Sequence, residues 1–170
     1  KMIAFGLSEK FAGSDAGGMR TVAKLDGDHY VLNGEKKWCT NAGCADIFSV
    51  FCVTDPESKG KRISGIIVEK GTPGFKLGKT EDKMGIRCVP VNELAFDNCR
   101  VPAANLLGGK PGFGFKHAMQ TLDRARPGVA RRSSMRCVVG IISRTAGWRW
   151  SSASTRPPGK TMTSGMKRWR

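Results

Sequence analysis

Short apolar segments alternate with turn residues over the first part of the chain, a pattern typical of β-strands. The segments at 20–25 and 29–32 flank an Asp-Gly-Asp turn, which predicts a β-hairpin. An Asn-Gly pair at 33–34 predicts a second hairpin directly afterwards, ahead of a segment over 35–40. Further strands are expected at 47–53, 63–69, 75–77 and 93–96. Their regular spacing predicts a mainly β fold, an antiparallel β-barrel or sandwich.

The pattern changes after Pro102, where a loop over 108–114 is rich in glycine. Phe115, Met119 and Leu122 then recur at spacings of four and three, as apolar residues do on one face of a helix. This spacing predicts a helix from about residue 113 to about residue 130.

The last part of the chain differs from the rest. Residues 131–170 hold ten Lys or Arg, no Asp or Glu, and three of the four tryptophans, whereas residues 1–130 hold 19 basic and 14 acidic residues. The net charge of +15 therefore belongs largely to this tail. Disordered tails usually carry few aromatic residues, so we expect a frameshifted or otherwise non-native segment. The expected parts are a β-domain over 1–105, a linker and first helix of a helical domain over 106–130, and the tail.

Two other interpretations stay open from the residues alone. A basic tail is typical of nucleic-acid-binding proteins, although the modest charge of the remaining chain argues against binding by its body. A degenerate gene product without function also fits the tail.

The six cysteines lack a C-x-x-C pair, and the chain has two His, so a zinc site is not expected. A disulfide framework is open by number, but we favour reduced, buried thiols. The apolar run at 2–7 opens the chain as if it were cut from a longer protein, and it is too short to span a bilayer.

The first candidate site is the segment over 5–18, where small residues follow a strand end. Successive backbone N–H groups in such a loop can cradle an anion, and Ser8 and Ser14 add hydroxyl donors. Taken alone, this segment is a weak signal, and a simple turn is the favoured interpretation.

Two further candidates are also modest signals. Alternation places Trp38 and Thr40 on one face of a strand end, where an indole and a hydroxyl could hold a planar ring. A buried core tryptophan is the plainer interpretation. Asp123 and Arg126 share one helix face, as in an ordinary surface ion pair.

The order and spacing of these segments resemble the acyl-CoA dehydrogenase family. Residues 7–15 (LSEKFAGSD) are similar to its T-E-P-G-A-G-S-D element, and residues 33–41 (NGEKKWCTN) to its N-G-x-K-x-W-I-T-N element. Three more stretches are similar to typical members, namely 67–75 (IVEKGTPGF), 82–87 (DKMGIR) and 96–103 (FDNCRVPA). The resemblance covers residues 3–130 and then stops, which also favours a frameshift.

The resemblance implies a middle β-domain between two helical domains, with FAD held between the β-domain and the helices. It also implies two sets of binding residues. For FAD they are Phe5, Leu7, Ser8, Gly13, Ser14, Trp38, Cys39 and Thr40. For the acyl-CoA substrate they are Ser14, Asp123, Arg124, Ala125 and Arg126. Trp38 would pack on the isoalloxazine ring, and Thr40 would hydrogen-bond near its N5 edge, while Cys39 would face away from the ring.

The implied reaction is α,β-dehydrogenation of an acyl-CoA thioester, with the hydride passing to FAD N5 and electrons to an electron-transfer flavoprotein. The resemblance further implies a homotetramer or homodimer, no membrane association, and a location in the bacterial cytoplasm, or the mitochondrial matrix in a eukaryote.

Two departures from the family pattern matter. Lys10 and Phe11 replace the usual Pro-Gly, so a bulky side chain is expected to hinder close approach to the flavin. Most members place the catalytic Glu late in the C-terminal domain, and a minority place it at the position of Ala125, which cannot accept a proton. We therefore expect no catalytic base in this chain and no dehydrogenase activity from the chain alone.

Overall fold

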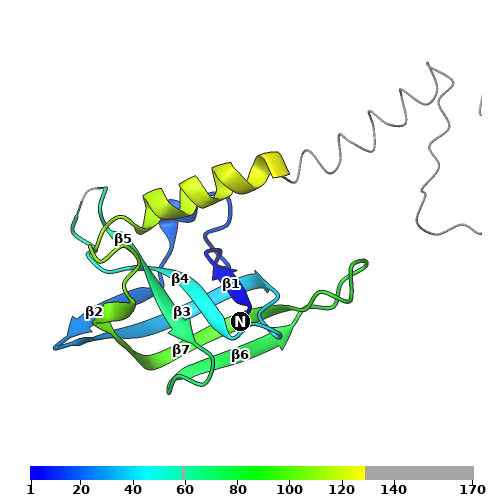
Figure 1. Ribbon diagram of the computed structural model, residues 1–170, viewed down its shortest axis with the longest axis horizontal. Coiled ribbons are helices and arrows are strands. Elements are labelled where there is room, and N and C mark those ends of the chain that lie inside the picture. The colour runs from blue at the N-terminus through cyan, green and yellow to red at the C-terminus, as the bar shows by residue number, and fades with distance from the viewer. Residues whose placement is uncertain (59, 129–170) are drawn as a thin grey trace, which may run out of the picture. The chain divides into compact units, whose positions relative to one another are not determined.

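The computed structural model describes residues 1–58 and 60–128. In this part of the chain, seven strands form one curled sheet and a helix follows over residues 114–128 (Figure 1). The strands are β1 (Ile3–Gly6), β2 (Val22–Asp26), β3 (His29–Thr40), β4 (Ile47–Val53), β5 (Ile63–Glu69), β6 (Phe75–Thr80) and β7 (Val91–Pro102). Two short 3-10 helices are η1 (Ala16–Gly18) and η2 (Ala103–Asn105). The frameshift and nucleic-acid-binding hypotheses for residues 131–170 lie outside the described residues.

The strands follow the order β1-β4-β2-β3-β7-β6, and β5 pairs with the other edge of β4. Antiparallel pairs join β2 to β3, β3 to β7, β6 to β7 and β4 to β5. The prediction of a mainly β fold is thus confirmed. The pairing of β1 with β4 is parallel, as is a single contact between β2 and β4. Alternation within one strand carries no information on the direction of its neighbour, so these parallel pairs were not predicted.

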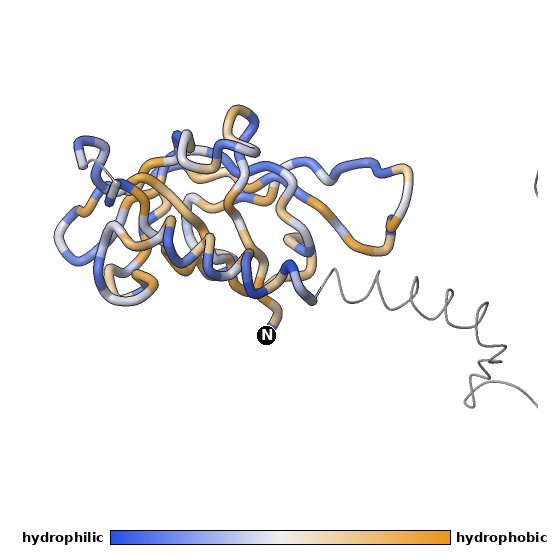
Figure 2. Tube along the Cα trace, turned by 90° about the horizontal axis from the view of Figure 1, so that it is seen from above, coloured by the Kyte–Doolittle hydropathy of each residue, from blue (hydrophilic) through white to orange (hydrophobic). Residues whose placement is uncertain are grey.

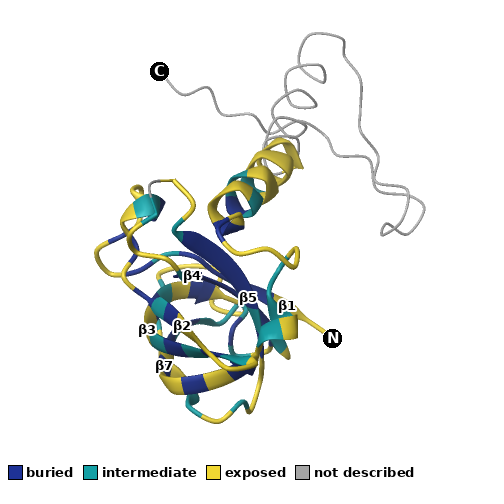
Figure 3. Ribbon diagram, turned by 90° about the vertical axis from the view of Figure 1, so that its left-hand side faces the viewer, coloured by how far each residue is buried: buried dark blue, intermediate teal, exposed yellow. Residues whose placement is uncertain are grey.

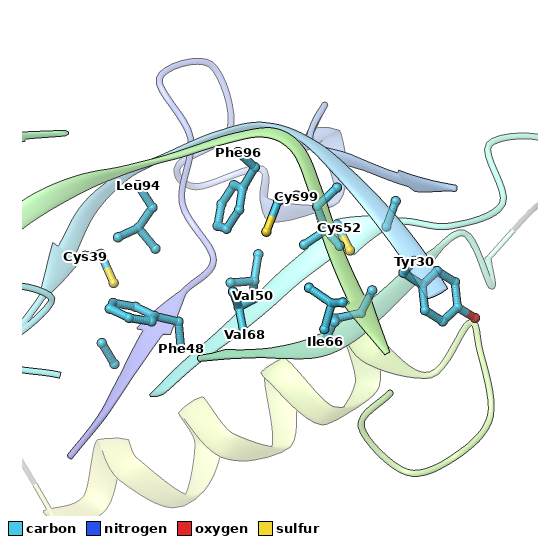
Figure 4. Packing of buried hydrophobic residues seen from close by; sticks show 14 of the residues in the cluster. Tyr30, Cys39, Phe48, Val50, Cys52, Ile66, Val68, Leu94, Phe96 and Cys99 are labelled. Atoms are coloured by element: carbon cyan, nitrogen blue, oxygen red, sulfur yellow. The ribbon is translucent and has the colours of Figure 1, made fainter. Parts of the chain in front are cut away.

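The concave side of the sheet encloses the main hydrophobic core (Figure 3). Phe48 on β4 and Phe96 on β7 both contact Phe75, with ring centroids 4.7 and 5.4 Å apart. Aliphatic side chains and thiols of six strands fill the space around them, as Figure 4 shows for Leu94, Val50 and Cys52 among others. The apolar stretches of the chain gather in the strands, whereas several connecting turns are hydrophilic (Figure 2).

A second apolar cluster lies on the other side of β4 and β5. Phe51 and Ile63 pack there against Ala118 of the helix. Gly114 starts the helix at a point where an added Cβ atom would lie 2.3 Å from the backbone carbon of Ser64, so only glycine permits this approach. The predicted helix is confirmed over residues 114–128, and residues 129–130 lie outside the described segment.

Two details of the sequence prediction were wrong. No hairpin turn occurs at Asn33-Gly34, because β3 runs through this pair, and Gly34 takes φ 137°. A Cβ atom on Gly34 would lie 2.8 Å from Thr21 Cα, so the glycine serves close backbone approach instead of a turn. Phe115 was placed on the apolar helix face, yet 38% of it is exposed, because the buried face centres on Gly114 and Ala118.

The cysteines divide into two groups. Cys39, Cys52 and Cys99 are buried free thiols, as expected. Cys44 and Cys88 are free but exposed, so the expectation of burial was wrong for them, because both lie in turns outside the strands. Cys137 lies outside the described residues.

Candidate functional site

The loop after β1 and the last residues of β3 lie side by side, although about 30 residues separate them in sequence. The backbone N–H of Lys37 donates a hydrogen bond to the carbonyl oxygen of Ser8 at 2.9 Å. The Cys39 thiol lies 3.4 Å from the carbonyl oxygen of Phe5. Two of the segments singled out from the sequence are therefore brought together at one place.

A β-bulge shapes the end of β3. Lys36 pairs with Leu94 and Cys39 with Asn92, so β3 advances three residues while β7 advances two. The extra residue shifts the alternation along β3 by one position, so that the core-facing residue after Lys36 is Cys39. Trp38 adopts φ 56°, a left-handed conformation that costs a bulky residue free energy, and 53% of its surface is exposed. The interpretation of Trp38 as a core residue was therefore wrong.

The neighbours of Trp38 follow from the bulge. Thr40 is exposed, whereas Cys39 is 1% exposed and points into the core beside Leu94 and Phe48 (Figure 4). Cys39 can therefore reach a ligand only through its backbone. Burial raises the pKa of the Cys39 thiol to about 11, so the thiol stays protonated and unreactive at neutral pH.

The loop over residues 7–14 has a buried base and an exposed tip. Leu7 is buried in the second apolar cluster, and the ring of Phe5 is half-buried, 5.0 Å from that of Phe51. Gly13 and Ser14 are exposed, and among the described residues no group accepts a hydrogen bond from their N–H groups. Their donors are therefore unused within the described part of the chain, as an anion cradle requires.

Lys10 and Phe11 occupy the tip of a tight turn that two backbone hydrogen bonds between Glu9 and Ala12 close. Phe11 is 69% exposed, and its ring centroid lies 5.4 Å from Lys10 Nζ and 5.1 Å from the Arg20 guanidinium. The bulky side chain thus projects into solvent between two cations.

A buried ion pair, which sequence reasoning missed, lies beneath the loop. Lys36 Nζ is 2.7 Å from Glu9 Oε1, and the two side chains are 0% and 7% exposed. Lys36 also donates to the carbonyl oxygen of Leu7 at 3.2 Å. Glu9 accepts further hydrogen bonds from the N–H of Arg20 at 2.7 Å and from the N–H and hydroxyl of Thr21 at 3.0 and 2.7 Å.

The ionisation of the pair reflects its environment. Burial acts to raise the pKa of Glu9, but hydrogen bonds from Lys36, Thr21 and Arg20 outweigh it and leave this pKa below its usual value. Burial lowers the pKa of Lys36, and the hydrogen bond to Glu9 opposes that effect. The sequence held one signal for this pair. Lys36 is separated from Tyr30 and Leu32 by an even number of residues, so alternation along the strand places it on the same inward face.

The predicted substrate residues lie on the helix over 114–128. Asp123, Arg124, Ala125 and Arg126 are all exposed. Arg124 lines a hollow of about 310 Å³ together with Leu107, Gly108, His117, Gln120 and Thr121.

Neither a metal-binding group nor a membrane span is found in the part of the chain that the structure describes. No three His, Cys, Asp or Glu side chains there lie close enough to hold a metal ion. No helix of the described residues is long and apolar enough to cross a bilayer.

The curled sheet and the adjoining loop and bulge define a recognised type of domain. Residues 4–99 match the family model for the middle domain of acyl-CoA dehydrogenases. The chain belongs to the acyl-CoA dehydrogenase family.

Individual relatives agree with this assignment. The short-chain specific acyl-CoA dehydrogenase of Clostridium acetobutylicum is 49% identical over 133 residues, covering 78% of this chain and 35% of the relative. The butyryl-CoA dehydrogenase structure from Megasphaera elsdenii has a TM-score of 0.73 and 51% identity, over 76% of this chain and 34% of that one. A structure of the electron transferring flavoprotein of Acidaminococcus fermentans has a TM-score of 0.73 and 52% identity, and the match covers 75% of this chain and 33% of that one. The chain thus spans about a third of the length of these relatives.

Proposed function

We propose that this chain supplies the flavin- and acyl-CoA-facing β-domain of an acyl-CoA dehydrogenase. The observation that carries the proposal is Trp38, a large aromatic side chain held exposed in a left-handed backbone conformation. An exposed aromatic side chain does not stabilise the core, so packing does not explain why the backbone is strained here. Such strain clusters at ligand sites. The loop over 7–14 lies directly beside it.

The residues present fit FAD. Trp38 offers an exposed indole face for a planar ring, and the exposed hydroxyl of Thr40 can hydrogen-bond the ring edge. The free N–H groups of Gly13 and Ser14 suit the anionic or carbonyl groups of a nucleotide cofactor. Phe5, Leu7, Ser8 and Cys39 would contribute mainly through their backbone.

When bound, FAD would supply the oxidising chemistry, accepting hydride from the β-carbon of an acyl-CoA thioester. The residues of this chain would bind and orient. Ser14 would serve both ligands, and Asp123 to Arg126 would line the substrate side.

The relatives named above support a proposed substrate class and a proposed electron acceptor. Short-chain acyl-CoA thioesters are the proposed substrates, since relatives carry the names short-chain specific and butyryl-CoA dehydrogenase. An electron-transfer flavoprotein is the proposed electron acceptor, supported by the match to the A. fermentans structure. We propose a homotetramer or homodimer for the parent enzyme, in the bacterial cytoplasm or the mitochondrial matrix.

The chain alone is proposed to lack the catalytic base. Ala125 stands where some family members are expected to carry the glutamate. Glu9, the buried carboxylate of the site, already accepts hydrogen bonds from Lys36, Thr21 and Arg20, so it is not available to remove a substrate proton.

The test is retention of flavin by the purified 170-residue chain. After incubation with FAD and removal of free cofactor by gel filtration, we expect flavin absorbance to co-elute with the protein, and butyryl-CoA to give no reduction of an electron-accepting dye. A folded chain that elutes without flavin contradicts the proposed cofactor, and dye reduction contradicts the proposed loss of the base.

A further inference from the structure

We propose, building on the flavin-facing function above, that the Glu9–Lys36 ion pair is a positioning element. It holds the loop over 7–14 and the bulge that carries Trp38 in one fixed geometry, so that the two parts of the flavin-facing surface are set together.

The contacts of Lys36 connect the two parts. Its backbone lies in β3, two residues before Trp38, at the last regular pair before the bulge. Its ammonium group reaches across to the Leu7 carbonyl oxygen at 3.2 Å and to the Glu9 carboxylate at 2.7 Å. The Lys36 side chain thus connects the strand before the bulge with the start of the loop, at Leu7 and Glu9.

The contacts of Glu9 extend this connection. Its two carboxylate oxygens accept from the N–H groups of Arg20 and Thr21, which follow the far end of the loop. The Thr21 hydroxyl lies 2.7 Å from Glu9 Oε1 and 3.1 Å from the carbonyl oxygen of Glu35, next to Lys36. The start of the loop, the segment that follows it and the strand before the bulge are therefore joined at the Glu9 carboxylate.

Stability alone does not account for a charged pair here. Replacing a buried ion pair by apolar residues of similar volume is often neutral or stabilising, because desolvation cancels much of the attraction. Apolar side chains would fill the same space, but they would not fix the direction of the Leu7 carbonyl or the Thr21 N–H. Directional bonds are what a ligand-facing loop requires, because ligand-contacting groups must be held in a precise geometry by supporting hydrogen bonds.

The decisive variant is Glu9→Gln with Lys36→Met, which removes both charges at nearly constant volume. We expect this double variant to fold with a melting temperature close to that of the wild type, and to bind FAD at least tenfold more weakly. The visible circular dichroism of the bound flavin should also change, because the ring would sit in a less defined environment. Lys37→Met is the matched control: this neighbouring lysine pairs with Glu93 and Glu35 instead, so its removal should change neither property.

The outcomes separate the two proposals. Failure of the wild-type chain to bind FAD overturns the proposed function itself. If the wild type binds FAD and the folded double variant binds with the same affinity and flavin spectrum, the positioning role is overturned. An unfolded double variant also overturns it, because the pair would then be needed for the fold and not for the site in particular.

Discussion

The two halves of β3 belong to one strand but are held in place differently. In the first half, Tyr30 and Leu32 alternate inward, and the strand pairs with β2 on one side and β7 on the other. In the second half, the inward position is taken by Lys36, a bulge follows, and Trp38 is exposed. Apolar burial fixes the first half, whereas the second half has only Cys39 in the core and depends on an ion pair and hydrogen bonds as well.

This difference separates folding from function within a single element. Apolar burial is non-directional and contributes about 25 cal/mol per Å² of buried surface, so it secures the strand without specifying fine geometry. Hydrogen bonds contribute less net free energy but define direction. We infer that the first half secures the domain and that the second half sets the proposed site.

The largest expected effect comes from weakening the first half. Leu32 is 0% exposed in the core, so Leu32→Ala should lower the free energy of unfolding by about 2–5 kcal/mol. Chemical denaturation measures this loss. FAD affinity of the folded fraction should remain unchanged, and a large loss of affinity would contradict the division between the two halves.

The junction between the halves should be the next most sensitive. Gly34→Ala forces a Cβ atom to 2.8 Å from Thr21 Cα at φ 137°, and we expect a loss of about 1–3 kcal/mol in the free energy of unfolding. Gly27→Ala is the control, since Gly27 also has positive φ but an added Cβ atom would meet nothing within 4 Å. Equal losses for the two variants in thermal denaturation would show that the close approach to Thr21 is unimportant.

The second half should respond to pH. The pKa of Glu9 is lower in the folded chain than in the unfolded chain. Its ionised form therefore stabilises the fold at pH values above the pKa of the unfolded chain, and this stabilisation is lost as the pH falls through the pKa of the folded chain. Below about pH 4.5, the wild type should therefore lose stability more steeply than Glu9→Gln, by at most about 1.4 kcal/mol per pH unit. Denaturation curves at several acidic pH values measure the difference, and parallel pH profiles would contradict the role assigned to Glu9.

The smallest effect on stability is expected at the exposed end of β3. Trp38→Gly removes a partly exposed side chain and relieves the left-handed strain, so the free energy of unfolding should stay the same or rise by up to about 1 kcal/mol. Trp38→Phe, which keeps a ring and the strain, should stay close to the wild type in both stability and FAD binding. A marked loss of stability in Trp38→Gly would mean that the indole supports the fold.

Sequence reasoning succeeded where one face of the chain is apolar. The strands β2, β4 and β5 and the helix begin within about two residues of their predicted positions, because alternation and helical spacing report burial directly. It failed where backbone geometry decides. The bulge at Trp38, a second shift near Asn98 on β7 and the continuity of β3 through Gly34 depend on pairing with distant residues.

The same limit applies to the candidate site. The loop over 7–14 and Trp38 were identified through the family resemblance, and the structure places them side by side. The ion pair of Glu9 and Lys36 was missed: alternation places Lys36 on the inward face of β3, but nothing in the sequence pairs it with Glu9, 27 residues away.

The most direct test of the account is an FAD titration of the 170-residue chain followed by quenching of flavin fluorescence, with Trp38→Ala compared against Leu25→Ala. Both residues are large, apolar and more than half exposed, but Leu25 lies on β2 in the hairpin with the first half of β3. We predict saturable quenching for the wild type and Leu25→Ala, and at least tenfold weaker binding for Trp38→Ala. Equal affinities for the two variants would contradict the assignment of the flavin-facing surface to the second half of β3.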